Sequence, residues 1–347
     1  MNYPERKFSK TQITKAGEIL KMTEEKFNVE EQENAYLVLA NWRACHTYPL
    51  NTFQATLRKK LSIIDKNAFV GQRLKRAHSI ILKLRRFDTM DLARMQDIAG
   101  LRAVVLDIKK VYSLEDSYRN ARFHHKLASF KDYIKCPKKD GYRGIHMIYR
   151  YNNKRAVKWN GLNIELQIRT RLQHSWATAV EIMGIFLKEA LKSGMGPEEW
   201  KKFFSATSAA FAMQEGCASV PGFEGKSLSE IVNMIRELER KLQALAKLRG
   251  FSVAVENIPN VNNRAYSLIR LDTEKRTVRI MSFTESQSEE ANNAYAREEA
   301  NAIGKPIEIV LVRTKSIKSL KRAYPNYFLD SKEFVQHISK LLQTYPS

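Results

Sequence analysis

Apolar residues recur at helical spacing along the first quarter of the chain. Residues 10–87 contain few Gly or Pro apart from Pro49 and Gly71, and this pattern predicts helices throughout. The clearest case is the amphipathic segment 71–86, GQRLKRAHSIILKLRR. The residues expected on its buried face are Leu74, Ala77, Ile81 and Leu84.

The middle of the chain combines short apolar runs with longer helical ones. Residues 98–108 are apolar and rich in β-branched side chains, as in a buried strand, and residues 146–151 and 162–168 predict two more strands. Asn160-Gly161, just before the last of these, is typical of a hairpin turn. Helical spacing returns at residues 170–190 and 197–213, so the pattern predicts a protein that contains both helices and strands.

A composition change marks the expected domain boundary. Residues 215–226, EGCASVPGFEGK, contain three Gly and one Pro. We therefore expect one domain over residues 1–220 and a smaller one over residues 226–347. The elements expected in the second are a long helix at 228–248, strands near 251–255, 266–271, 278–283 and 307–312, and helices at 286–303 and 331–343.

Charge narrows the class of partner. The chain has 347 residues, is 44% hydrophobic, and carries 59 Lys and Arg against 37 Asp and Glu, a formal net charge of +22. This is well above the magnitude of about 2–8 suggested for a soluble domain. An RNA or nucleotide partner explains it better than an excess that only aids solubility.

Other sequence features exclude several classes. Cys45, Cys136 and Cys217 are far apart and odd in number, which argues against a disulfide framework or a metal cage. The N-terminus lacks the apolar run of a signal peptide, and no window has the length of a membrane span. The sequence therefore predicts a soluble, cytoplasmic protein with no membrane partner.

The segment 71–86 also carries a cluster of cations. Lys75, Ser79 and Lys83 are four residues apart and would share one helix face, with Arg73 and Arg76 beside it. Like charges at this spacing repel, so the cluster is best explained by a bound polyanion such as a polyphosphate. The alternative is an ordinary solvated surface.

Three further blocks supply the other groups that phosphoryl-type transfer requires, which are cations, carboxylates for magnesium and a group that orients the attacking hydroxyl. Asp97 stands at a strand entrance, five residues before Arg102, in DIAGLR. Tyr142 lies between two Gly in the basic segment 131–146, KDYIKCPKKDGYRGIH, and can stack on a base. In IELQIRT, residues 164–170, alternation sends Glu165, Gln167 and Arg169 to one face.

Each candidate also has a purely structural interpretation. Asp97 can cap a helix, and Glu165 with Arg169 can form a cross-strand ion pair. Tyr142 can pack on the sheet. For His174 and Trp176, on an apolar helix face, a core position is the better interpretation. His146 is the last residue of the basic segment, and the sequence leaves a structural and a functional role open for it.

Together, the four blocks make the chain similar to the RelA/SpoT-type alarmone synthetases. The resemblance covers about residues 35–190 and includes the run IELQIRTRLQHSWATAVE at 164–181. It implies a nucleotidyltransferase-like fold, a mixed β-sheet flanked by helices, and hence an α+β protein. It also implies transfer of the β,γ-pyrophosphate of ATP to a ribose 3′-hydroxyl.

The resemblance assigns roles to individual residues. Asp97 would bind Mg²⁺, and Glu165 would bind Mg²⁺ and help to deprotonate the 3′-hydroxyl. Residues in contact with ATP would be Arg73, Lys75, Ser79, Lys83 and Arg102. Residues at the acceptor would be Lys138, Tyr142 and His146, supported by Gln167 and Arg169.

Two differences bear on the acceptor. The housekeeping enzymes usually carry Asn and Ser where this chain has Asp140 and Gly144, which weakens the case for a guanine nucleotide. Residues 41–53 and 172–181 are more similar to the toxic small alarmone synthetases, some of which pyrophosphorylate the 3′ CCA end of tRNA. We therefore expect a tRNA acceptor, with Lys138, Lys139 and Arg143 as candidate contacts. The alternatives are a synthetase of guanosine or adenosine alarmones and a non-catalytic sensor of nucleotides or phage proteins.

The C-terminal region resembles that of fused toxin–antitoxin proteins of the CapRel type. In those proteins a C-terminal domain restrains the toxin until a phage protein releases it, which implies a role in antiphage defence. They carry a Tyr-x-x-Tyr element that occupies the ATP site, and Tyr324 and Tyr327 match it. The alternative is that these tyrosines only pack between the last strand and helix.

Overall fold

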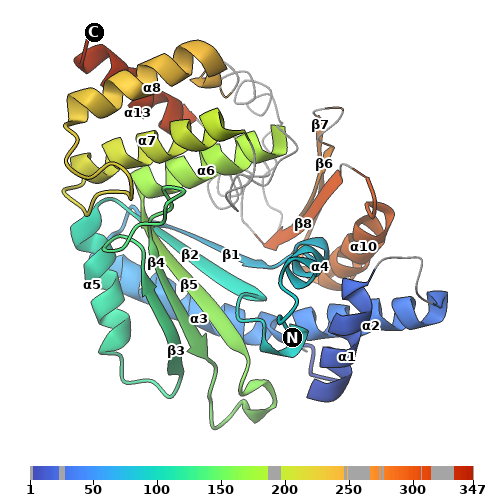
Figure 1. Cartoon of the computed structure of the whole chain (residues 1–347). Coiled ribbons are helices and arrows are strands. Elements are labelled where there is room, and N and C mark those ends of the chain that lie inside the picture. Colours follow the sequence, from blue (N-terminus) through green and yellow to red (C-terminus); the bar gives the residue numbers. More distant parts are fainter. Residues whose placement is uncertain are drawn as a thin grey trace.

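The structure is a computed structural model of the chain (Figure 1). It describes residues 3–22, 28–186, 197–245, 248, 266–272, 275, 277–305, 307–313 and 332–346. The strand expected at 251–255, together with Tyr324 and Tyr327, lies outside these residues. Among the helices of the described ranges, none is both long and apolar enough to cross a membrane.

Four helices form the N-terminal part of the fold. They are α1 (Lys10–Lys21), α2 (Val29–Cys45), α3 (Thr47–Ile64) and α4 (Ala77–Arg86). Ser9 begins α1 with a capping box that includes Gln12. Apolar faces of α1, α2 and α4 pack together around Trp42 and Leu92, the first residue of the short 3₁₀ helix η2 (Leu92–Arg94).

The prediction of a helix over residues 71–86 is wrong in its first third. Residues Phe69–Leu74 form strand β1, and α4 begins only at Ala77. Helical spacing misled here because Arg76 is extended and β1 pairs with a neighbouring strand, so tertiary pairing overrides the local pattern. On α4 itself, Ala77, Ile81 and Leu84 are buried as predicted, together with Ile80.

The described chain contains a five-stranded mixed sheet in the order β1-β2-β5-β4-β3. Its other strands are β2 (Ala99–Val105), β3 (Lys126–Asp132), β4 (Ile145–Arg150) and β5 (Asn163–Thr170). The β2–β5 pair is parallel and the other pairs are antiparallel. The predicted strands thus correspond to β2, β4 and β5, whereas β3 was not predicted. Two further elements join the strands, α5 (Ile108–Arg119) and the 3₁₀ turn η3 (Val157–Trp159).

Alternation along the strands gives this sheet two different faces. Leu101, Met147 and Leu166 point to one face, where they pack in a core with residues of α3 and α5. Their neighbours along the strands, including Arg102, His146 and Glu165, point to the other face. Because burial fixes the apolar face, it also fixes which polar side chains share the opposite one.

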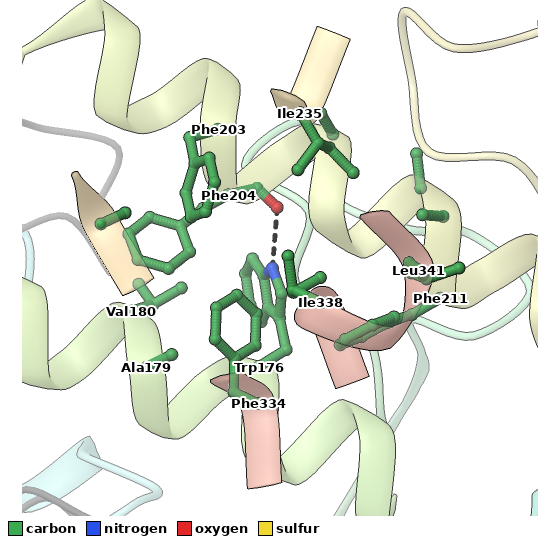
Figure 2. Close-up of a cluster of buried hydrophobic side chains, with 14 of the residues drawn as sticks. Trp176, Ala179, Val180, Phe203, Phe204, Phe211, Ile235, Phe334, Ile338 and Leu341 are labelled. Carbon is green, nitrogen blue, oxygen red and sulfur yellow. Dashed lines mark hydrogen bonds between the residues drawn. The ribbon is translucent and has the colours of Figure 1, made fainter. Parts of the chain in front are cut away.

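Helices α6 (Arg171–Phe186), α7 (Glu198–Gln214), α8 (Leu228–Leu242) and α13 (Lys332–Thr344) form a layer at one end of the sheet (Figure 1). Their shared core includes Trp176, Phe203, Phe211, Ile235 and Phe334 (Figure 2). Residues from both sides of the predicted boundary therefore contribute to one core.

A second, smaller sheet follows in the chain. Its strands are β6 (Tyr266–Asp272), β7 (Thr277–Phe283) and β8 (Ile307–Arg313), antiparallel in the order β7-β6-β8. Helix α10 (Ser288–Asn301), preceded by the 3₁₀ turn η5 (Glu285–Gln287), packs on it through Ala291 and Ala294. The division into domains at 1–220 and 226–347 stays a prediction.

Candidate functional site

The predicted catalytic residues lie on the face of the large sheet opposite α3 and α5. Across neighbouring strands, Gly100 pairs with Glu165, and Gln167 pairs with both Arg102 and His146. Asp97 lies two residues before β2. A methyl group on Gly100 would lie 3.7 Å from a Glu165 oxygen, so the absence of a side chain leaves room beside this carboxylate.

Asp97 contacts two lysines of the segment 71–86. Its Oδ2 accepts from Lys75 Nζ at 2.9 Å, and Lys83 Nζ lies 3.0 Å from both of its oxygens. Burial alone would raise the pKa of Asp97, but the charges of Lys75 and Lys83 outweigh it and hold this pKa below its ordinary value. Asp97 is therefore ionised near neutral pH and is not a helix cap.

Glu165 belongs to a closed ring of hydrogen bonds with four of the predicted acceptor residues, which are Tyr142, His146, Gln167 and Arg169. Glu165 Oε1 lies 2.9 Å from His146 Nδ1, and Oε2 accepts from Gln167 Nε2 at 2.8 Å. The Arg169 guanidinium donates to Gln167 Oε1 at 2.9 Å and to the Tyr142 hydroxyl at 2.8 Å. The Tyr142 hydroxyl also bonds His146 Nε2, which closes the ring. Glu165 and Arg169 are thus linked through Gln167, and not by the direct ion pair of the structural interpretation.

This ring shifts the pKa values of its members. Burial would raise the pKa of Glu165, but bonds from His146 and Gln167 and the charge of Lys75 outweigh it and lower this pKa to about 2. Burial would lower the pKa of His146, yet Tyr142 and Glu165 raise it to about 9. A protonated His146 therefore faces an ionised Glu165 at neutral pH.

The donor chemistry of the site suits magnesium. Mg²⁺ commonly binds one or two carboxylates and completes its shell with water and substrate phosphates. Asp97, just before β2, and Glu165 of the adjacent strand β5 provide two ionised carboxylates, and the charge of Glu165 acts against the ionisation of Asp97 without outweighing the two lysines. The chemistry of these two carboxylates therefore fits magnesium, with Asp97 and Glu165 as the residues that would hold it.

The other predicted ATP residues surround this centre. Arg73 pairs with Gly100 across the β1–β2 ladder, and Arg102 lies further along β2. Ser79 is in the first turn of α4 and Lys83 one turn later. The cations that were predicted to share one face of a single helix thus come from the end of β1, from the loop after it and from α4.

The segment before β4 is held by Asp140 and by Ser208, a residue of α7 that the sequence did not single out. Asp140 Oδ1 accepts from the Tyr142 backbone N–H at 2.9 Å, and Ser208 of α7 donates to the Gly141 carbonyl at 2.5 Å. A Cβ at Gly141, where φ is +91°, would lie 2.9 Å from Ser208 and 3.0 Å from Trp176. Only glycine fits this close approach to α6 and α7.

Arg143 is buried, although it was predicted to contact tRNA. It is 2% exposed, donates to Ser208 Oγ at 3.2 Å and pairs with Glu215 at 2.5 Å. Glu215 is also bonded by Thr170 and Gln173, so this buried network anchors the segment to the end of α7. The spacing of residues in the sequence could not predict this network, because Glu215 lies 72 positions after Arg143. Arg143 is therefore removed from the candidate RNA contacts.

A cavity of about 440 Å³ opens beside Tyr142. Its lining includes two lysines from each side, Lys138 and Lys139 before β4 and Lys201 and Lys202 of α7. Lys138 Nζ lies 4.5 Å from the centre of the Tyr133 ring and 5.1 Å from that of Tyr142. The cavity thus combines an aromatic ring with cations, and Tyr142 connects it to Glu165 through His146.

His174 and Trp176 are buried, as the core interpretation predicts. Trp176 is 4% exposed and donates from Nε1 to the Phe204 carbonyl at 2.7 Å (Figure 2). His174 is 5% exposed, and its ring contacts Phe69 edge-on. Cys45, Cys136 and Cys217, all of which the structure describes, carry free thiols.

Comparisons with known proteins place this site in a recognised region. Residues 72–184 match a family described as "Region found in RelA / SpoT proteins". Over 157 residues the chain is 29% identical to the GTP pyrophosphokinase YjbM of Bacillus subtilis (strain 168), which is 44% of this chain and 72% of that protein. Over 111 residues it is 30% identical to the GTP pyrophosphokinase YwaC of the same organism, covering 30% and 52% of the two chains.

One solved structure aligns with about half of the chain. The small alarmone synthetase 1 from Bacillus subtilis, bound to its product pppGpp, aligns with a TM-score of 0.45 and 22% identity, covering 50% of this chain and 91% of that one. Residues 72–184 are therefore similar to a region of RelA/SpoT proteins, and GTP pyrophosphokinases are among the relatives of the chain.

Proposed function

We propose that the protein is a magnesium- and ATP-dependent pyrophosphokinase that acts on a ribose 3′-hydroxyl. The observation that carries this proposal is the pair of ionised carboxylates Asp97, just before β2, and Glu165 of the adjacent strand β5. Asp97 contacts Lys75 and Lys83, which are predicted to bind ATP. Glu165 contacts His146 and Gln167, which are predicted to lie at the acceptor. The GTP pyrophosphokinases among its relatives support the same reaction class.

In the proposed reaction, the 3′-oxygen attacks the β-phosphorus of ATP and the bond from that phosphorus to the α–β bridging oxygen breaks. AMP leaves and the hydroxyl proton is released to water. Lys75, Lys83 and Arg73 hold the phosphates. A bound Mg²⁺, held by Asp97 and Glu165, would neutralise charge that develops on the phosphate oxygens.

The low pKa of Glu165 bears on its role in the reaction. A carboxyl whose pKa is about 2 is a weak base near neutral pH, whereas an efficient general base has a pKa near the working pH. Glu165 therefore serves better as a metal ligand and as the acceptor that orients the 3′-hydroxyl. His146 and Gln167 keep its oxygens directed into the site.

As the acceptor we propose the 3′ CCA end of tRNA. The net charge of +22 and the lysines beside Tyr142 support it, because a chain of phosphates would lie along the cavity while a terminal base stacks on an aromatic ring. Transfer should then fall steeply with added salt. Lys139→Glu with Lys202→Glu should weaken tRNA use, whereas Lys59→Glu with Lys66→Glu, on exposed positions in or near α3, should not.

A guanine nucleotide is the second candidate, and one observation favours it. Asp140 accepts from the Tyr142 N–H through Oδ1, a contact that an Asn side chain makes equally well. The difference at this position therefore leaves the backbone of the pocket unchanged. An adenosine alarmone and a non-catalytic sensor remain further alternatives.

The acceptor is identified by transfer of label from [γ-³²P]ATP. Deacylated tRNA, the same tRNA after periodate oxidation of its 3′-terminal diol, and GDP are compared as acceptors. The proposal expects label in intact tRNA and none in the oxidised tRNA. Label in GDP alone identifies an alarmone synthetase, and label in none of the acceptors indicates a non-catalytic sensor.

We also propose that the C-terminal region restrains the enzyme and that a phage protein relieves this restraint, so that released activity blocks translation in infected cells. The resemblance to CapRel-type fusions supports this, with Tyr324 and Tyr327 as the proposed restraining residues. A trigger would act through its different affinity for the restrained and released states.

A further inference from the structure

Arg43 of α2 forms a buried contact between the two parts of the chain. It is 6% exposed, and its Nε donates to the Lys75 carbonyl at 2.9 Å. Its Nη1 pairs with Glu299 of α10 at 3.0 Å, and its Nη2 donates to the Tyr295 hydroxyl. Arg43 thus joins the junction between β1 and α4 to a helix more than 250 positions later in the chain.

The second oxygen of Glu299 caps α4. Glu299 Oε1 accepts from the backbone N–H of Ala77, the first residue of α4, at 3.0 Å, and from the Tyr295 hydroxyl at 2.8 Å. Arg76 precedes the helix, and a guanidinium has no acceptor atom with which to cap it. The carboxylate that compensates the positive end of α4 therefore comes from α10 (Figure 1).

The place that Glu299 occupies has the properties of a phosphate site. A helix N-terminus and a guanidinium together bind phosphate as readily as carboxylate, since both ligands present ionised oxygens. Ser79, in the same turn of α4, and Lys75, whose carbonyl Arg43 holds, both belong to the proposed ATP site. A phosphate bound there would meet the negative charge of Glu299.

We propose that Arg43 and the N-terminus of α4 form an anion site for a phosphate group of ATP, and that Glu299 occupies this site while α10 is docked. Nucleotide binding and docking of α10 then exclude each other. This inference rests on the proposed binding of ATP along residues 71–86. It adds a phosphate ligand, Arg43, and a competing carboxylate, Glu299.

The neighbouring residue provides a matched control. Glu298 pairs with Arg270 of β6 at 3.6 Å, within the small sheet and its helix. Glu298→Gln and Glu299→Gln remove the same charge from consecutive positions of α10. Only the second change removes a carboxylate from the N-terminus of α4.

The test measures binding of an ATP analogue with a methylene group between the α- and β-phosphorus atoms, which cannot transfer pyrophosphate. Isothermal titration calorimetry with Mg²⁺ is carried out on the full chain. Glu299→Gln should bind about tenfold more tightly than wild type, within the usual range of coupling between two sites, and Glu298→Gln should match wild type. In the Glu299→Gln background, Arg43→Lys should reverse most of the gain because a bidentate donor is lost.

Two outcomes would overturn the inference. Equal affinity of wild type and Glu299→Gln means that the carboxylate only caps α4. Weaker binding by Glu299→Gln means that it supports the nucleotide site. Tyr295→Phe, which loosens the same contact while Glu299 stays in place, should give a smaller gain and guards against misfolding of one variant. Absence of binding by every protein would instead refute the proposed use of ATP.

Discussion

Replacing Asp97 with Asn should abolish transfer while the protein stays folded. The shape of the side chain is kept, but both lysines lose the charge that they contact at 2.9–3.0 Å. Loss of one pre-positioned charged group typically costs about 10²–10³ in rate, or about 2.7–4 kcal/mol. We expect a loss in this range, because Asp97 both positions the lysines and would hold magnesium.

The same substitution should have a smaller effect on stability. Asp97 and Lys75 are each 21% exposed in their side chains and Lys83 is 29% exposed, so solvent screens the cluster in part. We expect the free energy of unfolding to fall by about 1–2 kcal/mol, less than for a fully buried pair. Burial already lowers the pKa of Lys75, and this pKa should fall further once Asp97 no longer opposes the effect.

The assay combines initial rates of label transfer with urea denaturation. Asp107→Asn is the matched control, since Asp107 caps α5 and Asn can form the same cap. Because the folded pKa of Asp97 lies below its ordinary 3.8, its stabilisation is present above that pH and is lost as the pH falls through the folded value. The stability difference from wild type should therefore narrow in acid. A folded Asp97→Asn protein with more than a tenth of the wild-type rate would refute the assignment.

Three further predictions concern the other parts of the site. Glu165→Gln should reduce transfer at least about 100-fold while binding of the ATP analogue persists, and near-normal transfer would exclude Glu165 from the reaction. The pKa of His146 is raised to about 9, so its contribution to stability is complete below pH 6.5 and is lost as the pH rises through 9. In urea, the advantage of wild type over His146→Gln should accordingly shrink between pH 6.5 and 9, and a constant difference would contradict the ring of bonds around Glu165. Tyr324→Ala with Tyr327→Ala should make the protein constitutively toxic, and normal growth of cells that express a folded, ATP-binding double mutant would identify these tyrosines as packing residues.

Point variants are better tests of restraint than truncation. Removal of residues 226–347 would take away α8 and α13, whose Ile235 and Phe334 share a core with Phe203 and Phe211 of α7 (Figure 2). Exposure of that core would favour aggregation whatever the regulatory role of the region. A soluble protein is therefore expected only when these helices are kept.

The face of the central strands that carries the site follows from local pattern. Alternation in IELQIRT places Glu165, Gln167 and Arg169 together, and the structure brings all three onto the face that also carries His146. Alternation is reliable here because the opposite face is buried on α3 and α5, so a shift of one residue would bury the charges. The apolar run that begins at Ile98 was predictable as β2 for the same reason.

Long-range contacts could not be predicted in this way. Arg143 looked like a surface cation in a basic segment, yet Glu215 and Ser208 bury it. Similarly, nothing in the spacing around Arg43 indicates Glu299 as its partner. β1 was missed because the helical period of 71–86 continues into a strand whose pairing only the folded chain reveals.

The most direct test of the central claim is the nucleotide that remains of ATP after turnover with deacylated tRNA. Transfer of pyrophosphate from the β-phosphorus releases AMP, whereas transfer of a single phosphoryl group releases ADP. Chromatography of a reaction with [γ-³²P]ATP should show one AMP for each label that reaches the acceptor, and both products should form about 10²–10³-fold more slowly with Asp97→Asn. Formation of ADP, or AMP without labelled acceptor, would contradict the account.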